Sequence, residues 1–284
     1  MSFTIVTVLH DSAPELAQLL RSVRDQLPDD TQLVAVDSGS CDDGPALATA
    51  AGAEVTVLDG NPGFGAASNA GVARARHDVT VLLNPDCELR DAGLADLAAR
   101  AAGFEALLVP RLIEADGALQ RSAHPLPGRP SALVRAVLPT RALPQPHRAR
   151  RPRPVGWAIA ACLAADTALL RELGPFDPAV HLLAEDMELG LRARRLGVPT
   201  VLHPRLRVRH TGGHAVLRDG EPFALLARRR REAIESALGS RARTLDDLAQ
   251  LLTFATRIGA RAALGRDAAR ERAQLAALRR EIGS

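Results

Sequence analysis

Apolar positions follow two different spacings along the first half of the chain. Short aliphatic runs that end in polar or glycine-rich turns are typical of buried strands, whereas apolar residues three and four positions apart are typical of helices. The two patterns alternate, which predicts βαβ units and an α/β fold around a mostly parallel sheet. The predicted strands are 3–9, 32–36, 54–58 and 79–83, and the helices between them are 14–26, 46–51 and a segment that ends near 76.

The second half of the chain is less regular. Residues 126–154 hold seven arginines and many prolines but no acidic residue, which predicts an exposed loop with a short helix near 132–137. Two interpretations of this loop stay open: a solvated linker, or a segment that grips phosphate or acceptor. The other predicted helices are 94–102, 167–173 and one that begins at 184, and the other predicted strands are 106–109, 156–164, 199–203 and 206–210.

From residue 222 onward the pattern is helical, so we predict one domain at 1–221 and a helical C-terminal extension at 222–284. The extension is amphipathic and rich in arginine. Three roles stay open for it: packing on the core, pairing with a partner, or peripheral contact with an anionic membrane at the inner face of the plasma membrane. Its predicted apolar stripe is Leu245, Leu248, Leu251, Leu252, Ala255 and Ile258.

Composition narrows the class of protein. The 284 residues carry a net charge of +3, every Lys or Arg is an arginine, and 46% of residues are hydrophobic. No apolar run approaches the roughly 20 residues that span a bilayer, and the N-terminus enters a strand directly, so we expect a cytoplasmic protein. Three distant cysteines argue against a disulfide framework or a zinc cluster. One Trp, six Phe and no Tyr argue against a stacking platform for single-stranded nucleic acid, so nucleic acid is not a predicted partner.

The segment Val79–Glu88 carries the most informative polar residues. Its aliphatic half predicts a strand buried on both faces, and Asn84-Pro85 ends that strand because proline has no N–H for a sheet ladder. Asp86 and Glu88 follow directly. Ligands of open α/β sheets bind at the carboxyl ends of the strands, and carboxylates there suit a hard divalent cation that holds phosphates. An ordinary polar turn is the alternative interpretation.

Three further polar groups lie at predicted strand ends or helix starts: 37–43, 61–69 and 185–186. Parallel topology brings such ends to one edge of the sheet, so we expect them to share a cleft with Asp86. Glycines in the second group allow backbone to approach a ligand closely. Asp37 is placed to accept hydrogen bonds from a nucleobase or ribose. The alternative interpretation is an aspartate that only forms the turn.

The order of these groups resembles the family 2 glycosyltransferases of the GT-A fold, in particular their bacterial rhamnosyltransferase-like branch. The resemblance runs from Thr4 to about His214. It implies a single Rossmann-like, mostly parallel sheet flanked by helices. The matching stretches are Thr4–Val8, Val36–Asp42, Asn61–Gly71, Leu83–Asp86, Gly174–Asp177, Ala184–Leu189 with Arg192, and His210–Gly213.

The resemblance also implies a role for each matching residue. Asp186 corresponds to the catalytic base, with Glu185 as its neighbour. Asp86 corresponds to the last acid of an Asp-x-Asp motif that holds Mg²⁺ or Mn²⁺, with His210, and Glu88 as a helper, in the metal shell. Trp157 lies where the acceptor pocket forms, although a buried core tryptophan is equally compatible. The implied nucleotide-sugar residues are Asp37, Ser38, Asn61, Gly63, Gly65, Asn69 and Asn84.

These roles together imply an inverting, metal-dependent glycosyltransferase of the hexosyltransferase class. Its donor is a nucleoside-diphosphate sugar, and its acceptor is the hydroxyl of a saccharide, a lipid-linked molecule or a small molecule. Such a transfer needs one base and one metal site, without a covalent intermediate. We expect a role in cell-envelope polysaccharide or glycolipid synthesis.

The chain departs from the family pattern at several positions. His10-Asp11 stands where Tyr-Asn is common, Asn84 replaces the first acid of the Asp-x-Asp motif, and Leu182 and Leu183 replace aromatic residues before Glu185. The substitution at residue 84 leaves a metal site with one charge fewer, which gives His210 more weight. Donor and acceptor preferences therefore do not transfer from other members.

Two other functions remain open from the residues alone. A sugar-phosphate nucleotidyltransferase shares the nucleotide-binding half, but it typically carries a glycine-rich, lysine-bearing loop after the first strand, and residues 9–14 show nothing similar. A non-catalytic protein that binds nucleotides or an anionic polymer is the second alternative.

Overall fold

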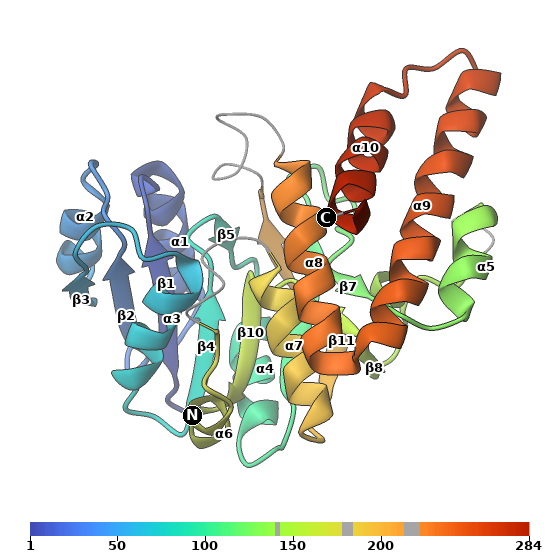
Figure 1. Ribbon diagram of the computed structural model, residues 1–284. Helices are drawn as coiled ribbons and strands as arrows, with labels where there is room; N and C mark the ends of the chain where they lie inside the picture. Colours follow the sequence, from blue (N-terminus) through green and yellow to red (C-terminus); the bar gives the residue numbers. More distant parts are fainter. Residues whose placement is uncertain (140–142, 178–183, 213–221, 284) are drawn as a thin grey trace. The chain divides into compact units, whose positions relative to one another are not determined.

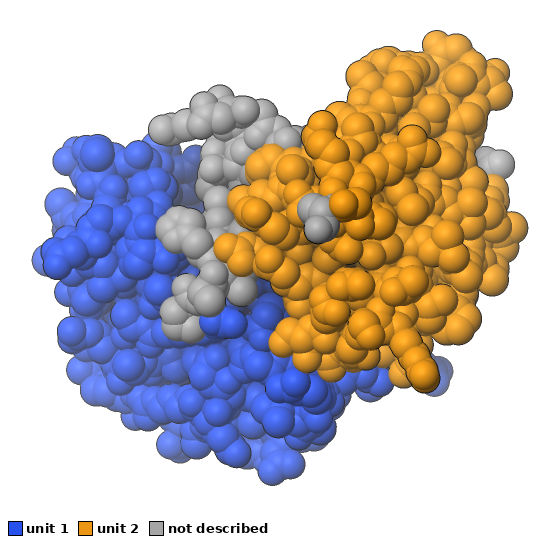
Figure 2. Space-filling model, viewed as in Figure 1, with its two compact units in different colours: residues 1–124, 146–212 blue, residues 125–145, 213–284 orange. Residues whose placement is uncertain are grey.

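The computed structural model describes residues 1–139, 143–177, 184–212 and 222–283 (Figure 1). The chain forms two compact units, coloured separately in Figure 2. Unit 1 comprises 1–124 and 146–212, and unit 2 comprises 125–145 and 213–284. We predicted domains at 1–221 and 222–284; the structure instead groups 125–145 with the C-terminal helices.

Unit 1 is built on a sheet of nine strands in the order β3-β2-β1-β4-β10-β6-β11-β5, with β8 paired to β11. The predicted α/β fold with a mostly parallel sheet is confirmed: β1, β2, β3 and β4 run parallel, as do β6 and β11. The strands are β1 (Thr4–Leu9), β2 (Gln32–Asp37), β3 (Glu54–Val57), β4 (Val79–Leu83), β5 (Cys87–Glu88), β6 (Leu107–Ile113), β8 (Arg153–Val155), β10 (Cys162–Asp166) and β11 (Thr200–His210).

Helices cover both faces of this sheet, so the central strand β4 is buried on both sides. Val79, Val81 and Leu83 join one apolar cluster, and Leu82 joins the other. Helices α1, α2 and α4 contribute to the first cluster, and α3, α6 and α7 to the second. The bounds are α1 (Ala13–Gln26), α2 (Gly44–Ala50), α3 (Phe64–Ala73), α4 (Gly93–Ala101), α6 (Thr167–Leu173) and α7 (Glu185–Arg195).

Three predicted strands take a different form. The predicted strand 156–164 is split into β9 (Trp157–Ala158) and β10, because Ile159 N–H donates to Ser122 O and leaves the main ladder. Strand β9 pairs instead with β7 (Ala123–His124) in a small second sheet. The predicted strands 199–203 and 206–210 are one strand, β11, whose register against β6 shifts between His203 and Arg207.

Unit 2 is helical, and α5 (Ser131–Val137) packs against α9 (Ser240–Ala263). Thr256 Oγ1 donates to the Ala136 carbonyl at 2.7 Å. Gly128, with a φ of +67°, sits so close to Ala242 that an added Cβ would lie 2.6 Å from the Ala242 Cβ. These contacts explain why the predicted short helix near 132–137 groups with the C-terminal helices. The remaining helices of unit 2 are α8 (Phe223–Leu238) and α10 (Ala269–Gly283).

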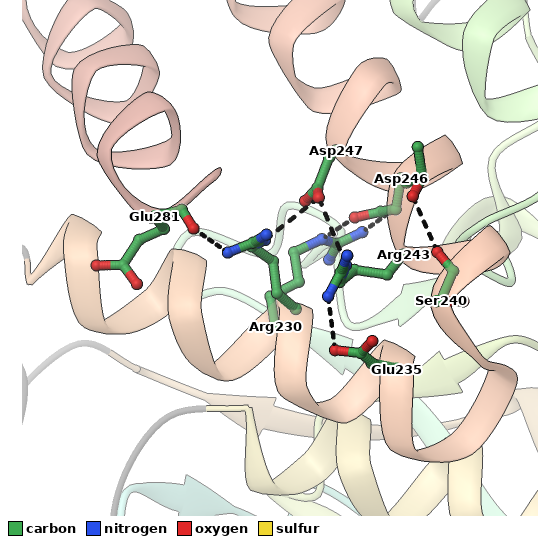
Figure 3. A network of polar contacts seen from close by, with 9 residues as sticks. Arg230, Glu235, Ser240, Arg243, Asp246, Asp247 and Glu281 are labelled. Atoms are coloured by element: carbon green, nitrogen blue, oxygen red, sulfur yellow. Dashed lines mark hydrogen bonds and ion pairs between the residues drawn. The ribbon is translucent and has the colours of Figure 1, made fainter. Parts of the chain in front are cut away.

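The buried face of α9 is partly ionic. Leu248 and Ala255 of the predicted stripe are exposed, whereas Asp246 and Asp247 are buried. Figure 3 shows the reason: acids of α9 meet arginines of α8, which offset the cost of burying their charge. These ion pairs are Arg230–Asp246 at 2.7 Å and Arg231–Asp247 at 3.2 Å; a third pair runs the other way, from Arg243 of α9 to Glu235 of α8 at 2.7 Å. Within the described ranges, no helix is both long and apolar enough to cross a membrane.

Candidate active site

The Asp86 carboxylate is held at both of its oxygens. Oδ1 lies 3.3 Å from His210 Nε2, and Oδ2 accepts a hydrogen bond from the Gly212 N–H at 3.0 Å. The Asp86 carbonyl accepts from the Thr211 N–H at 3.1 Å. Burial by itself raises the pKa of Asp86, but the hydrogen bond and charge of His210, together with the Gly212 N–H, bring that pKa below its usual value. The structure thus brings the predicted pair Asp86 and His210 together.

His210 is oriented by Gln120, which the sequence did not indicate. His210 Nδ1 lies 2.9 Å from Gln120 Oε1. When Nδ1 carries the ring proton and donates it to that oxygen, Nε2 turns a lone pair toward Asp86. A proton on Nε2 makes the hydrogen bond to Asp86, and a metal ion beside Asp86 would take the place of that proton. This orientation by a second residue is typical of histidines that bind metal ions.

Asn84 adds an unsatisfied oxygen near Asp86. Its backbone N–H donates to Ala161 O at 2.9 Å, and its carbonyl accepts from the Cys87 N–H at 3.1 Å. The side-chain Oδ1, however, is buried and has no hydrogen-bond partner among the described residues. An unpaired buried acceptor costs free energy, so this oxygen is placed to accept from a ligand or to bind a cation.

The donor set fits a small metal site. No group of three or more His, Cys, Asp or Glu side chains is arranged to hold a metal within the part of the chain that the structure describes. Mg²⁺ in phosphate-transferring sites usually has only one or two protein carboxylates and takes its other ligands from phosphate and water. Asp86 and the unpaired oxygen of Asn84 are donors of this kind, and His210 Nε2 adds a nitrogen donor.

Glu88 is engaged elsewhere. Its carboxylate forms ion pairs with Arg209 at 2.7 Å and with Arg90 at 3.2 Å, and it accepts a hydrogen bond from Gln18 Nε2 at 2.8 Å. The ion pair with Arg209 ties β5 to β11, whose register places Arg209 opposite Glu88. The predicted helper role of Glu88 in the metal shell remains a prediction, and these contacts indicate that the side chain supports the loop instead.

Asp186 lies in the first turn of α7, and Glu185 is its neighbour. The residue before them, Ala184, has a φ of +68°, a left-handed conformation that non-glycine residues adopt at a cost of about 1–2 kcal/mol. Such local strain is common at functional sites. Burial, reinforced by the charge of Glu185, raises the pKa of Asp186 to about 8, against a smaller opposing effect of the Ala160 N–H, which donates to it.

The Asp186 carboxylate and the Asn84–Asp86 loop are both hydrogen-bonded to the backbone of Ala160 and Ala161. The Ala160 N–H binds the Asp186 carboxylate, and the next carbonyl, that of Ala161, accepts the Asn84 N–H. Two consecutive residues therefore connect the proposed base to the loop that carries Asp86. This link joins two of the four predicted polar groups, and the cleft that all four were expected to share remains a prediction.

The carboxyl ends of β1 and β2 form a second part of the site. Asp37, the last residue of β2, is buried and accepts from the Ser40 N–H at 3.3 Å. Ser38 Oγ donates to Asn61 Oδ1 at 3.0 Å, and that oxygen also accepts from the Gly63 N–H at 3.0 Å. His10 connects to both loops, with Nδ1 2.9 Å from Ser38 O and Nε2 3.4 Å from Asn61 Nδ2.

Glycines let these loops approach each other. Gly39 has a φ of +75°, and a Cβ added there would lie 3.0 Å from the Gly60 carbonyl oxygen. Gly63, with a φ of +95°, precedes the first residue of α3 and turns the chain into that helix. Gly65 is buried within α3. The glycine-rich turn predicted from the sequence thus begins a helix, whose N-terminal N–H groups favour anions.

Asn69 is committed to the fold. Its Nδ2 donates to Phe176 O at 2.8 Å, and its Oδ1 accepts from the Phe176 N–H at 3.0 Å. The Phe176 ring also packs edge-on against Phe64, with ring centroids 5.4 Å apart. The predicted contact of Asn69 with a nucleotide sugar remains a prediction, and its amide as observed fastens the 175–177 turn to α3.

Trp157 of β9 is half-buried and stacks on His124 of β7, with ring centroids 4.0 Å apart and an interplanar angle of 10°. Its other neighbour is α7, where a Cβ added to Gly190 would lie 3.0 Å from the Trp157 Cβ. Trp157 therefore connects the helix of the proposed base to the small β7–β9 sheet. A single tryptophan is visible in the sequence, but this stacked pair depends on a contact across many residues.

Comparisons with known proteins agree with this fold and give the family of the chain. The family model described as glycosyl transferase family 2 matches residues 4–149. The chain belongs to this family and is a glycosyltransferase. This result decides against the nucleotidyltransferase and non-catalytic alternatives.

Individual relatives are more distant. The N-acetylglucosaminyl-diphospho-decaprenol L-rhamnosyltransferase of Mycobacterium tuberculosis is 26% identical over 238 residues, which cover 76% of this chain and 78% of that protein. The resemblance to the rhamnosyltransferase-like branch is thereby confirmed. Among solved structures, GalNAc-T7 with UDP, GalNAc and Mn²⁺ has a TM-score of 0.61 at 18% identity, over 83% of this chain and 48% of that one. The mannosyltransferase PcManGT of Pyrobaculum calidifontis, with GDP-Man and Mn²⁺, has a TM-score of 0.58 at 18% identity, over 97% and 79%.

Proposed function

We propose that this protein transfers a sugar, with inversion, from a nucleoside-diphosphate sugar to a hydroxyl of a lipid-linked saccharide during cell-envelope synthesis. The observation that carries the proposal is the link through Ala160 and Ala161 between Asp186 and the Asn84–Asp86 loop. It supports a base and a diphosphate-binding loop that act on the same bond.

The donor side of the proposal uses the ends of β1, β2 and β4. Asp37 accepts hydrogen bonds from the nucleoside, and the Ser38–Asn61–His10 contacts hold the loops that surround it. Asn84 and Asp86 face the diphosphate. A Mg²⁺ or Mn²⁺ ion bound by Asp86 and His210 would supply positive charge that stabilises the departing nucleoside diphosphate.

The acceptor side uses Asp186. In its ionised form, this carboxylate accepts the proton of the acceptor hydroxyl while that oxygen bonds to the anomeric carbon and the bond to the diphosphate breaks. The attack comes from the face opposite the leaving group, so the configuration inverts. Glu185 does not take the proton in this scheme; its charge helps to set the pKa of Asp186.

The acceptor assignment is supported by the relative from Mycobacterium tuberculosis, whose name states a diphospho-decaprenol-linked acceptor and an L-rhamnosyl donor. A lipid-linked acceptor lies at a membrane. Unit 2 offers a surface for such contact: an apolar groove of about 700 Å³ between α8 and α10, with Arg228 and Arg280 among its lining residues. We place the protein at the inner face of the plasma membrane through these helices.

The function is tested with a panel of nucleoside-diphosphate sugars that includes an L-rhamnosyl donor, with Mn²⁺ and short-chain lipid-diphosphate saccharides as acceptors. We expect transfer from one donor, and the product to have the anomeric configuration opposite to that of the donor in NMR spectra. Retention of configuration would contradict the inverting mechanism, and the absence of transfer or hydrolysis across the whole panel would contradict the donor class.

The pKa of Asp186 predicts a pH dependence. A base with a pKa of about 8 is mostly protonated below that value, so kcat/KM is expected to fall about tenfold per unit as the pH decreases below 8. Glu185→Gln removes the negative charge beside Asp186 and should move this limb to lower pH. The measurement is a kcat/KM profile between pH 5.5 and 9.5 for both proteins; the same limb in both would contradict the coupling.

Membrane contact is tested by co-sedimentation with liposomes that contain phosphatidylglycerol. Each arginine near an anionic surface contributes about 1 kcal/mol, so Arg228→Gln with Arg280→Gln should weaken binding by about 2 kcal/mol, or roughly thirtyfold. Arg241→Gln with Arg266→Gln removes the same charge from other exposed positions of unit 2 and serves as the control. Equal binding by wild type and the first variant would remove the groove from the proposal.

A further inference from the structure

Unit 1 contains an arginine cluster that the catalytic scheme does not use, formed by Arg111, Arg148, Arg150, Arg151, Arg153 and Arg207. Arg111 of β6 and Arg207 of β11 are register partners on adjacent strands. Like charges at directly opposite positions destabilise a sheet. Burial, and then the charge of Arg207, lower the pKa of the Arg111 guanidinium.

The other four arginines lie at or just after the 3₁₀ helix η2 (Pro146–Arg148). Arg148 is the last residue of η2, and Arg150, Arg151 and Arg153 follow it. This 3₁₀ helix packs against β7 and β11, and Arg111 Nη2 donates to the Ala149 carbonyl just beyond it. The buried His147 lies in the positive electrostatic potential of these arginines. Its pKa is lowered by burial and then by the charges of Arg121, Arg148 and Arg111. The segment after η2, residues 149–154, lines an open surface pocket of about 620 Å³.

Within the described part of the chain, the cluster has no acidic partner. The sequence has no Asp or Glu between Asp116 and Asp166, and none of the six arginines forms an ion pair with a described acid. Arg111 Nε is buried and has no hydrogen-bond partner among the described residues. The arginines of α8 in unit 2 differ, because acids of α9 pair with them. A buried guanidinium N–H without an acceptor is costly, and a bound anion would satisfy it.

The cluster lies on the acceptor side of the site. Strands β6 and β11 are separated from the donor-binding ends of β1 and β2 by β4 and β10. Arg121, next to His147, immediately precedes Ser122 and β7, and β7 pairs with β9, which carries Trp157. Helix α7, which carries Asp186, packs on β9. The arginines are therefore connected to the helix of the base, not to the nucleotide loops.

We propose that the arginine cluster binds the diphosphate of the acceptor, so that the substrate is a saccharide whose reducing end is esterified to an isoprenoid diphosphate. The inference rests on the proposed glycosyl transfer. It adds that the protein recognises the acceptor through its diphosphate. Arginine suits the task because its planar guanidinium binds phosphate oxygens in pairs. Nucleic acid fits less well, because the chain has one Trp, six Phe and no Tyr for base stacking.

The test measures binding of geranyl diphosphate by calorimetry at low salt, with the full-length protein. Arg150→Gln/Arg151→Gln/Arg153→Gln removes three exposed arginines that make no described hydrogen bond through their side chains, so folding should be unaffected. We expect a loss of affinity of at least tenfold. Arg21→Gln/Arg74→Gln/Arg100→Gln, at other exposed positions of unit 1, makes the same change in net charge and should stay within twofold of wild type.

Three results would overturn the inference. They are equal losses in the two triple variants, displacement of geranyl diphosphate by saturating nucleotide with Mn²⁺, and tighter binding of a 20-mer single-stranded RNA that is lost in the cluster variant. Nucleotide-sugar binding is titrated separately. A protein that binds nucleotide sugar but not geranyl diphosphate contradicts this inference alone, whereas one that binds geranyl diphosphate but no nucleotide sugar contradicts the proposed function.

Discussion

Asp186→Asn is expected to reduce kcat by about 10²–10⁴-fold, the contribution that a positioned general base typically makes. The substitution keeps the size of the side chain and an oxygen that can accept from the Ala160 N–H, but it removes the carboxylate that we propose takes the acceptor proton. KM for the donor should change little, because the residues proposed to bind the donor lie at the ends of other strands. The measurement is steady-state kinetics with the donor and acceptor that the panel identifies.

The same variant tests folding independently. The raised pKa of Asp186 means that the folded state favours the protonated form, so the wild type loses stability as the pH rises from the unfolded-state value of about 4 toward 8. A neutral asparagine escapes this penalty. The melting temperature of Asp186→Asn at pH 8 should therefore equal or exceed that of wild type. Full activity in a folded Asp186→Asn protein would exclude Asp186 as the base.

Asp86→Asn is expected to abolish the Mn²⁺-dependent part of donor-nucleotide affinity. The carboxylate is the one acidic group proposed for the metal, since Asn84 contributes only a neutral oxygen. Loss of a direct ligand should exceed the roughly 10–100-fold cost that is typical when a residue behind a ligand is changed. Calorimetric titration of the nucleotide, with and without Mn²⁺, measures this difference directly.

Glu88→Gln and Gln120→Ala are the controls for this experiment. The first should lower the melting temperature, because Arg209 and Arg90 lose their charged partner, but it should leave the metal dependence intact. The second should weaken the metal dependence moderately, because Gln120 orients His210. The same metal-dependent affinity in Asp86→Asn as in wild type would place the metal elsewhere.

Much of the core of the α/β sheet was predictable because its strands carry a local signal. Val79–Leu83 is apolar throughout, as a strand buried on both faces requires, and the structure places it between β1 and β10. The strand ends were equally visible, because Asp37 and Asn84-Pro85 interrupt apolar runs. The ladder of β9 was not predictable, because its pairing with β7 depends on residues more than thirty positions away.

Residue types and their order along the chain were sufficient to identify the family and to nominate Asp86, Asp186 and His210. Tertiary structure alone revealed that Gln120 contacts His210, that Ala184 before the proposed base has a left-handed backbone, and that Arg111 lies opposite Arg207 with no ion-pair partner among the described acids. The physical reason is the distance along the chain over which each interaction acts. Periodicity and turn chemistry act between neighbours in sequence, whereas burial, hydrogen-bond geometry and the field around an ionisable group depend on residues that only folding brings together.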